Sequence, residues 1–375
     1  MRRTTLALLA AGVGVSLALT ACGANQETPS GGGQTSNGGG APAGGVKVGV
    51  ILPETATSAR WEGFDKPLLE AAMRAEGLDP DIQNAQGDVQ KFTTLADGMI
   101  SSGVKVLVMA SINAASANAI AARAKQRGIP TIDYDRLNLG GTSEYYVSFD
   151  NVKVGQLQGQ GLADALKGKQ GAQVIEIEGA PTDNNATLFH EGQQKVLKPL
   201  YDSGALKLVQ SQPIDDWNNQ KGGTVFEQIL TGNGGKVDGV VAANDGLAGA
   251  VITVLKKNGL NGKVPVTGQD ATPDGLKAIL AGDQYMTVYK PIKQEAEAAA
   301  KLAAALAKGD KAAADALAKD TVHDPTGNRD VKSVLREPQL ITKNEVKNVI
   351  ADGFVKASEI CTGNLAAICT ELGIS

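Results

Sequence analysis

The chain has 375 residues, of which 42% are hydrophobic and 20% are charged, and its formal net charge is −4. This length allows about two domains, and the composition is that of a globular protein. The negative net charge and the lack of a basic cluster argue against a nucleic-acid partner, because binders of a phosphate backbone need basic patches.

The first residues have the pattern of an export signal. Arg2 and Arg3 precede an apolar run from Leu6 to Leu19, and Leu-Thr-Ala then leads directly to Cys22. An ordinary cleaved secretion signal and an N-terminal membrane anchor share part of this pattern. The cysteine directly after Leu-Thr-Ala, however, resembles the lipobox of bacterial lipoproteins. That resemblance implies a signal peptide over residues 1–21 that is removed and a lipid attached to Cys22.

Residues 22–45 are a polar stretch rich in Gly and Ser, with almost no apolar side chains. Such a segment cannot bury enough apolar surface to fold. About 24 flexible residues have a root-mean-square span of roughly 25–30 Å. We interpret the stretch as a tether between a lipid anchor and a folded body. The sequence therefore predicts an extracytoplasmic protein, held by lipid on the outer face of the cell membrane.

From Val46 the chain alternates predicted strands and helices. Hydrophobic periodicity predicts strands at 46–52, 81–85, 104–109 and 129–134, and helices at 60–76, 89–102 and 114–127. After a short strand-like run at 145–149 the pattern restarts, with strands at 172–178, 206–210, 237–243, 263–267 and 285–289. Helices are expected at 152–166, 186–200, 221–230, 247–258 and 273–280. This alternation predicts an α/β fold of two Rossmann-like lobes, each with a parallel sheet covered by helices.

An Ala-rich helix at 291–308, with a second helical piece to 319, follows the second series. We expect it to return to the first lobe, and the chain to cross again near 322–330. Crossings near 149–152, 288–291 and 322–330 would form a three-strand hinge that limits the lobes to opening and closing. The predicted N-terminal lobe is 46–149 plus 291–322, and the C-terminal lobe is 150–290 plus 323–375.

Cys361 and Cys369 are an even pair in a chain with an export signal, and no His or acidic cluster accompanies them. We expect a structural disulfide that closes a short C-terminal loop and stabilises the fold modestly. The two histidines, His190 and His323, stand apart, and no pair of residues has metal-ligand spacing. The sequence therefore predicts neither a metal site nor a cofactor.

Polar and aromatic residues collect near the ends of predicted strands, where open α/β sheets bind ligands. They are Arg60-Trp61, Asp135-Arg136, Asp183-Asn184-Asn185, Trp217, Asn244-Asp245, Gln269-Asp270 and Lys290. A neutral sugar needs planar hydrogen-bonding groups around its rim and an aromatic surface against its C–H face. This set supplies both.

Each of these residues also has a purely structural interpretation. Those that precede helices, such as Asp183 and Asn244, can act as N-caps, and Asp135 with Arg136 can be a structural ion pair. Lys290 can be a solvated lysine, and a lone tryptophan is more often core than stacking surface, although Trp217 lies in the polar run DDWNNQ. Paired carboxylates could also perform glycosidic acid–base chemistry. The shared position at strand ends favours binding, and no nucleophile–histidine arrangement or phosphate loop is apparent.

The segments RWEGFD, YDRLN, YVSFDNVKVGQLQ, PTDNNATLFHEGQ, VAANDGLAGA, TGQDA and MTVYKPI occur in this order. They resemble segments of the D-xylose-binding proteins of ABC importers, which are periplasmic binding proteins of the ribose/galactose type with the type I fold. The resemblance covers Val46 to about Lys356 and implies a pyranose sugar held between two lobes. It implies hydrogen bonds to the hydroxyls from Arg60, Arg136, Asn185, Asn244, Asp270 and Lys290. It also implies that Trp61 and Trp217 sandwich the ring and that Asp135 and Asp183 add contacts.

The resulting expectation is a lipid-anchored, monomeric substrate-binding protein of an ABC sugar importer. It would bind D-xylose or a related aldose and deliver it to the membrane permease, without catalysis. The segments 57–59 and 218–219, beside the expected stacking residues, depart from the family pattern, so an aldose is the firmer expectation than xylose. An exported receptor for another sugar-like signal is the alternative, with a glycosidase a weaker one.

Overall fold

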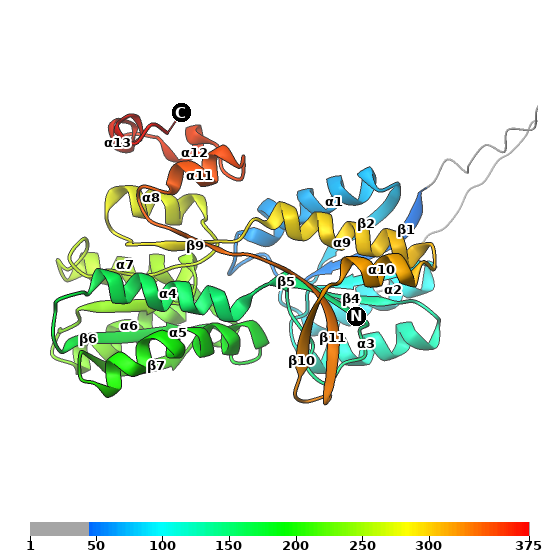
Figure 1. Ribbon diagram of the computed structural model, residues 1–375, viewed down its shortest axis with the longest axis horizontal. Helices are drawn as coiled ribbons and strands as arrows, with labels where there is room; N and C mark the ends of the chain where they lie inside the picture. The colour runs from blue at the N-terminus through cyan, green and yellow to red at the C-terminus, as the bar shows by residue number, and fades with distance from the viewer. Residues whose placement is uncertain (1–44, 375) are drawn as a thin grey trace, which may run out of the picture. The chain divides into compact units, whose positions relative to one another are not determined.

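The computed structural model describes residues 45–374. The expected signal peptide, the lipidation site at Cys22 and the tether up to residue 44 lie outside these described residues. Within them the chain builds two separate main sheets, each covered by helices, and a small two-stranded sheet (Figure 1). The α/β fold predicted from the alternating pattern is confirmed.

The first main sheet has seven strands in the order β10-β11-β5-β4-β3-β1-β2, all parallel except β10, which runs antiparallel to β11. Its central strands β3, β4 and β5 are buried at every residue, as expected for a parallel sheet covered on both faces. Its strands are β1 (Val46–Leu52), β2 (Leu78–Asn84), β3 (Val106–Met109), β4 (Thr131–Tyr134), β5 (Tyr145–Phe149), β10 (Asp320–Asp324) and β11 (Arg329–Arg336).

Two sets of helices cover this sheet (Figure 1). On one face lie α1 (Lys66–Ala75), α9 (Ile292–Ala307) and α10 (Lys311–Leu317), and on the other α2 (Val89–Ser101) and α3 (Ala114–Gln126). A short π-helix, η1 (Trp61–Asp65), leads into α1. The alanines of α9 are mostly buried, so this helix lies close against the sheet and α1. We call this sheet with its helices the first lobe.

The second main sheet has three parallel strands in the order β7-β6-β8, and Val266 adds a single parallel bridge to Val240. The strand predicted at 263–267 is therefore reduced to one bridge. The strands are β6 (Ala172–Glu178), β7 (Leu206–Pro213) and β8 (Gly239–Ala242). One face is covered by α4 (Asn151–Ala165) and α5 (Asn184–Asp202), the other by α6 (Asn219–Gly232) and α7 (Asp245–Lys257). A short 3-10 turn, η2 (Asp215–Trp217), precedes α6.

The C-terminal segment packs beside α8 (Pro273–Ala281) and completes the second lobe, which is this sheet with its helices and the segment 339–374. Here β9 (Thr287–Tyr289) pairs antiparallel with β12 (Gln339–Ile341). The short helices α11 (Val346–Ala351), α12 (Ala357–Ile360) and α13 (Leu365–Glu371) follow. Cys361 and Cys369 are joined by a disulfide in this segment.

Most strand-to-helix turns end in a side chain that caps the next helix. Asp88, Asn113, Asp150, Asp183 and Asn244 each accept a hydrogen bond from a backbone N–H in the first turn of the helix that follows. Short polar side chains are favoured there because they satisfy N–H groups that have no partner within the helix. The turns after the strands are therefore polar for a structural reason, and they lie at the carboxyl edges of the sheets.

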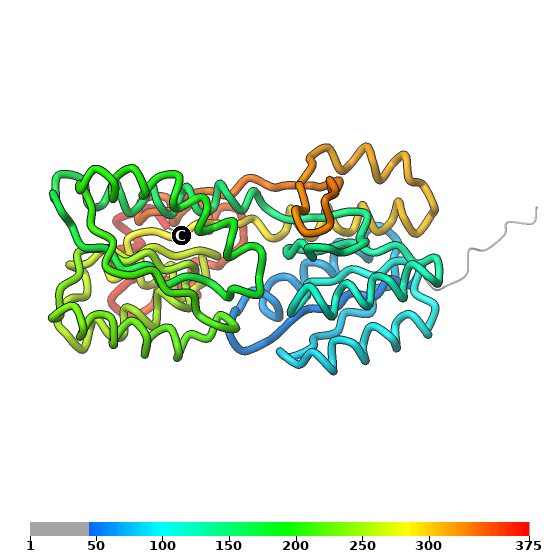
Figure 2. The backbone as a smooth tube through the Cα atoms, turned by 90° about the horizontal axis from the view of Figure 1, so that it is seen from below, coloured from blue at the N-terminus to red at the C-terminus, as the bar shows by residue number. Residues whose placement is uncertain are grey.

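The chain passes between the lobes three times (Figure 2): from β5 into α4, from β9 into α9, and from β11 into β12. The first two agree with the expected positions, but the third crossing, expected at residues 322–330, is at residues 337–338. The expected lobe boundary at residues 322–323 is also wrong, because β10 and β11 are both strands of the first sheet. Asp150 N donates to Arg336 O at 3.1 Å, so the first and third crossings lie side by side.

The hairpin of β10 and β11 explains this correction. Residues 324–329 form a tight turn in which the carboxylate of Asp324 accepts from the N–H groups of Thr326 and Gly327 and from Arg329 Nε. The same carboxylate accepts from Gly140 N in the first lobe. Val331 and Val334 are buried against that lobe. These contacts hold the segment as an edge hairpin of the first sheet.

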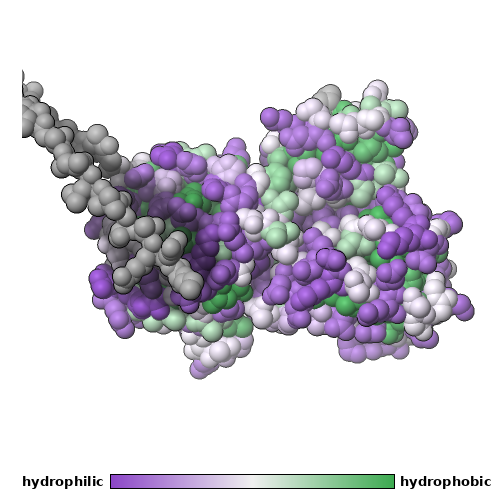
Figure 3. Space-filling model, turned by 180° about the vertical axis from the view of Figure 1, so that it is seen from behind, coloured by the Kyte–Doolittle hydropathy of each residue, from purple (hydrophilic) through white to green (hydrophobic). Residues whose placement is uncertain are grey.

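The visible face in Figure 3 is mainly hydrophilic, with small apolar areas between polar ones. Among the described residues the large apolar side chains that are exposed come from separate parts of the chain, namely Val46, Val89, Leu208, Tyr285 and Leu317. Within residues 45–374 no helix is both long enough and apolar enough to cross a bilayer.

Candidate ligand-binding site

A cavity with about 360 Å³ of empty space, part of it open to solvent, lies between the carboxyl edges of the two main sheets. Its lining residues are Glu54, Thr57, Ser58, Arg60, Trp61, Asp135, Arg136, Asp183, Asn185, Phe189, Trp217, Asn244, Gln269, Asp270 and Lys290. All the residues predicted from the sequence to bind a ligand are in this set.

Both lobes contribute to the cavity. The first lobe supplies Arg60 and Trp61 at the start of η1 and Asp135 and Arg136 directly after β4. The loop after β1, also in the first lobe, adds Glu54, Thr57 and Ser58. The second lobe contributes residues from the start of α5, from η2, from the start of α7 and from the loop before α8, while Lys290 lies in the second crossing. The site is thus formed by turns at strand ends, as open α/β sheets generally form their ligand sites.

Arg60 is held by three carboxylates. Its Nε and Nη2 donate to Asp65 at 2.9 and 2.7 Å, its Nη1 donates to Asp135 at 2.5 Å, and Nη2 also donates to Glu295 at 3.0 Å. The guanidinium carbon lies 4.4 Å from the centre of the Trp61 ring, within cation–π range. Burial strongly raises the pKa of Glu295, which limits the negative charge gathered around one arginine. Most donors of Arg60 are therefore used within the protein.

Asp135 links the lobes. It accepts from Arg60 within its own lobe, and its backbone oxygen and Oδ2 accept from Asn185 Nδ2 of the second lobe at 2.8 and 3.2 Å. Burial raises the pKa of Asp135, but the charges of Arg60, Lys290 and Arg136 outweigh this effect and hold it below its ordinary value. Asn185 Oδ1 accepts from Asn151 Nδ2 at 2.9 Å. The side chain of Asn185 is thus occupied by protein partners.

Asp183 caps a helix and positions two cavity residues. Its Oδ1 accepts from Asn185 N at 3.0 Å, and its Oδ2 contacts Trp217 Nε1 at 3.1 Å and Arg136 Nε at 2.9 Å. Asp183 therefore acts as an N-cap and also lines the cavity. Trp217 also meets Phe189 edge to face, with ring centres 6.4 Å apart. The indole plane is fixed by these contacts, as a stacking surface requires.

Every cation that lines the cavity is paired with a carboxylate. Arg60 pairs with Asp135, Arg136 pairs with Asp183, and Lys290 Nζ lies 3.1 Å from Asp270 Oδ1. Glu54, which also lines the cavity, accepts from the backbone N–H groups of residues 56–58. An anionic or cationic ligand would disturb this balance, because a buried charge needs its own partner. The arrangement suits a neutral ligand with many hydroxyls.

Backbone strain is concentrated here. Asp135, Trp217 and Asp270 have φ values of 61°, 55° and 98°, a region that residues other than glycine rarely adopt. Such conformations cost free energy and persist where the surrounding structure enforces them, often at functional sites. All three side chains line the same cavity.

Sequence reasoning missed part of the lining. Glu54 follows β1 and would have been found by the rule already applied to the other strand ends. Phe189 lies one helical turn after Asn185, so it could have been found from the i, i+4 spacing on α5. Asp245 was considered beside Asn244 but does not line the cavity. It is a buried acceptor for Gln284 and Thr287 instead.

Comparison with known proteins places this geometry in a family. A model described as "Periplasmic binding protein domain" matches residues 48–311. The D-xylose-binding periplasmic protein of Escherichia coli is 40% identical over 316 residues, which cover 84% of this chain and 92% of that protein. This chain belongs to the periplasmic binding protein family.

Two solved structures of the family show the same fold. An ABC transporter solute binding protein from Clostridium phytofermentans with bound β-D-glucose is 31% identical, with a TM-score of 0.76, over 84% of this chain and 99% of that one. A carbohydrate transporter solute binding protein from Chloroflexus aurantiacus in complex with D-glucose is 29% identical, with a TM-score of 0.77, over 85% of this chain and 98% of that one. The predicted family and its two-lobed fold are confirmed. So is the prediction that the chain is not an enzyme, because members of this family are binding components of transporters.

Proposed function

We propose that this periplasmic binding protein binds one neutral monosaccharide, D-xylose or a related aldose, in the cavity between its lobes. The observation that carries the proposal is the pairing of all three lining cations with carboxylates, next to two tryptophans. Paired charges present many fixed donors and acceptors, and they leave no lining cation free to pair with an anionic ligand. The D-xylose and D-glucose named for its relatives are ligands of this kind.

We propose different roles for the lining residues. Arg136, Asn244, Asp270 and Lys290 hydrogen-bond the sugar hydroxyls, with added contacts from Arg60, Asp135 and Asp183, and Trp61 and Trp217 pack against the ring. Oδ1 of Asn244 caps α7 by accepting from Leu247 N at 2.8 Å, so its amide group is the part that can donate to a ligand. Asn185, expected to bind a hydroxyl, acts mainly by joining the lobes, since its donors and its acceptor already have protein partners.

The wider setting is part of the same proposal. The chain delivers its sugar to the permease of an ABC importer as a monomer, and a lipid on Cys22 holds it at the outer face of the cell membrane. The transporter role follows from the relatives, which are named as periplasmic and ABC transporter binding proteins. The lipid anchor is supported by the Leu-Thr-Ala-Cys22 sequence and the Gly-rich tether after it.

Calorimetric titration of the full chain with a panel of pentoses and hexoses tests the ligand. We expect one aldose to bind with a stoichiometry of one, and no product to form. Arg136→Ala and Asp270→Asn should each weaken that binding at least tenfold, about 1.4 kcal/mol. The first change leaves buried Asp183 without the cation that pairs with it, and the second leaves buried Lys290 without its carboxylate. Asparagine is chosen at residue 270 because it tolerates a positive φ.

A matched control is the exposed pair of Arg123 and Asp97, which lies outside the cavity. Arg123→Ala and Asp97→Asn should keep the wild-type affinity. Turnover of the sugar, preference for a charged ligand, or wild-type affinity in both cavity variants would each contradict the proposal.

A further inference from the structure

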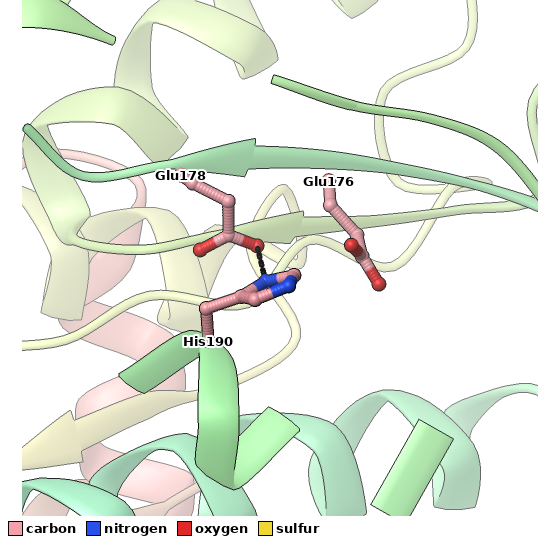
Figure 4. Close-up of side chains that lie close together, drawn as sticks. All are labelled: Glu176, Glu178 and His190. Carbon is pink, nitrogen blue, oxygen red and sulfur yellow. Dashed lines mark ion pairs between the residues drawn. The ribbon is translucent and has the colours of Figure 1, made fainter. Parts of the chain in front are cut away.

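A second cluster of ligating side chains lies in the second lobe, apart from the sugar cavity. Glu176 and Glu178 of β6 project from the same face of the strand toward His190 of α5 (Figure 4). One ligating atom from each of the three residues lies within 4.8 Å of the other two. None of the three lines the cavity described above. His190 lies twelve positions after Glu178 in the chain, so no local sequence spacing reveals the cluster.

One of these carboxylates, Glu178, is buried with few partners for its oxygens. Glu178 is 5% exposed, and among the described residues neither of its oxygens accepts a hydrogen bond. Its ion-pair contact is His190 Nδ1, at 3.5 Å from Oε1, the contact drawn in Figure 4.

The neighbouring carboxylate brings a second negative charge to the same place. Glu176 is fully buried and accepts only from neutral groups, Gln194 Nε2 at 3.0 Å and Tyr201 Oη at 2.8 Å. Within residues 45–374 no Lys or Arg nitrogen lies within 4.0 Å of either glutamate. Two buried carboxylates beside one imidazole would gain from a cation that joins them.

Two carboxylates and one imidazole favour some metal ions over others. Zinc accepts imidazole nitrogen and carboxylate oxygen at about 2.0–2.2 Å, usually with tetrahedral geometry. Magnesium and calcium prefer oxygen ligands alone, so an imidazole disfavours them. Small side-chain rotations are sufficient to bring atoms 4.8 Å apart onto one ion. The His190 side chain is 42% exposed, which gives an ion a path from solvent.

We propose that Glu176, Glu178 and His190 bind a divalent transition-metal ion, with zinc as the best fit. The ion joins β6 to α5 across one face of the second sheet. The end of β6 leads to the start of α5, where Asp183 and Asn185 reach the cavity. Binding of the metal therefore stabilises the part of the second lobe that presents these two residues, without contacting the sugar.

Zinc titration of the chelator-stripped full chain tests this site, with a chromophoric chelator as competitor. We expect the wild type to bind one equivalent of zinc per chain. His190→Gln and Glu178→Gln should each weaken the zinc affinity at least tenfold. The matched control is His323→Gln, because this other histidine is exposed and, among residues 45–374, pairs with Asp330 alone. It should bind zinc as the wild type does. Zinc should also raise the thermal unfolding temperature of the wild type and of His323→Gln but not of His190→Gln.

Three outcomes would overturn the site. The wild type could take up no zinc, which would leave Glu178 and His190 as an ion pair only. His190→Gln, shown by circular dichroism to be folded, could retain the wild-type zinc affinity. Magnesium could bind at the same place with equal affinity, which would exclude a site selective for transition metals.

Discussion

At the residue scale, single side chains both stabilise the fold and line the cavity. The carboxylate of Asp183 caps α5 with one oxygen and positions Trp217 and Arg136 with the other. A carboxylate can do this because its two oxygens offer about four acceptor positions. From the sequence the polar residues at strand ends could be predicted, since they follow a local rule. Which oxygen contacts which partner could not, because the partners come from distant parts of the chain.

Gly179, between β6 and Asp183, lies directly against the ring of Trp217. A Cβ atom at this position would lie 2.1 Å from Cη2 of the Trp217 ring, so only glycine allows the indole to lie here. We expect Gly179→Ala to displace the ring and to weaken binding of the preferred sugar at least tenfold, with the fold retained. Calorimetry gives the affinity, and tryptophan fluorescence reports the altered environment of the indole.

The control for this change is Gly63→Ala, also close to the cavity in sequence, where a Cβ would meet nothing within 4 Å. It should bind the sugar as the wild type does. If Gly179→Ala kept the wild-type affinity, Trp217 would not be part of the ligand surface.

At the element scale, glycines set how closely α4 and α5 approach. A Cβ on Gly155 of α4 would lie 1.9 Å from Phe189 O, and one on Gly192 of α5 would lie 2.1 Å from Val152 O. The backbones are therefore in direct contact. Glycine lowers helix propensity, yet hydrophobic periodicity predicted both helices, at 152–166 and 186–200, and both are present. The role of the glycines in packing appears only when both helices are placed on the sheet.

Gly192→Ala should destabilise the second lobe. Overpacking usually costs about 1–3 kcal/mol, and a clash with backbone atoms is expected at the upper end or beyond. Chemical denaturation of the purified chain measures this loss. Gly98→Ala and Gly249→Ala are the controls, because these helical glycines have open space around the would-be Cβ. Each should be neutral or stabilising by about 0.5–1 kcal/mol. Equal effects in all three variants would contradict the packing argument.

The edge hairpin shows the limit of element prediction. Val322 and Val331 alternate with polar residues, and the turn contains Gly327 and Asn328, which has a φ of 45°. This pattern is typical of a hairpin, yet sequence reasoning interpreted the segment as a crossing. Whether this segment forms a hairpin or a crossing depends on whether the first sheet has a free edge beside β5. That edge is a property of the assembled lobe. Local patterns therefore predicted the elements better than the connections between them.

At the scale of the whole molecule, buried carboxylates make stability depend on pH. Asp245 accepts from Gln284, Thr287 and Thr272, and these bonds join α7, α8 and β9. Burial raises the pKa of Asp245 to about 7, and the charge of Asp270 adds to the rise while the hydrogen bonds oppose it. In an unfolded chain the pKa is about 3.9.

Between these two pKa values the folded chain binds a proton at Asp245 that the unfolded chain does not. The stability from this group is therefore complete below about pH 4 and is lost as the pH rises through about 7. We expect the free energy of unfolding to fall between pH 5 and pH 7 by up to about 1.4 kcal/mol per pH unit for this group. Asp245→Asn should reduce this slope, even if the loss of one acceptor oxygen lowers its stability overall. Denaturation at a series of pH values measures both slopes, and equal slopes would contradict the assignment.

The bonds between Asp135 and Asn185, and between Arg136 and Asp183, have a consequence for affinity. They join the two lobes through protein atoms alone, so they help to set the fraction of molecules that are closed, whatever ligand is offered. The apparent dissociation constant of a ligand that binds only the closed form equals its intrinsic constant divided by that fraction. Two proteins with identical cavities can thus respond to different sugar concentrations. Because Asn185 acts mainly between the lobes, a change there can adjust affinity through this equilibrium while the other lining residues stay the same.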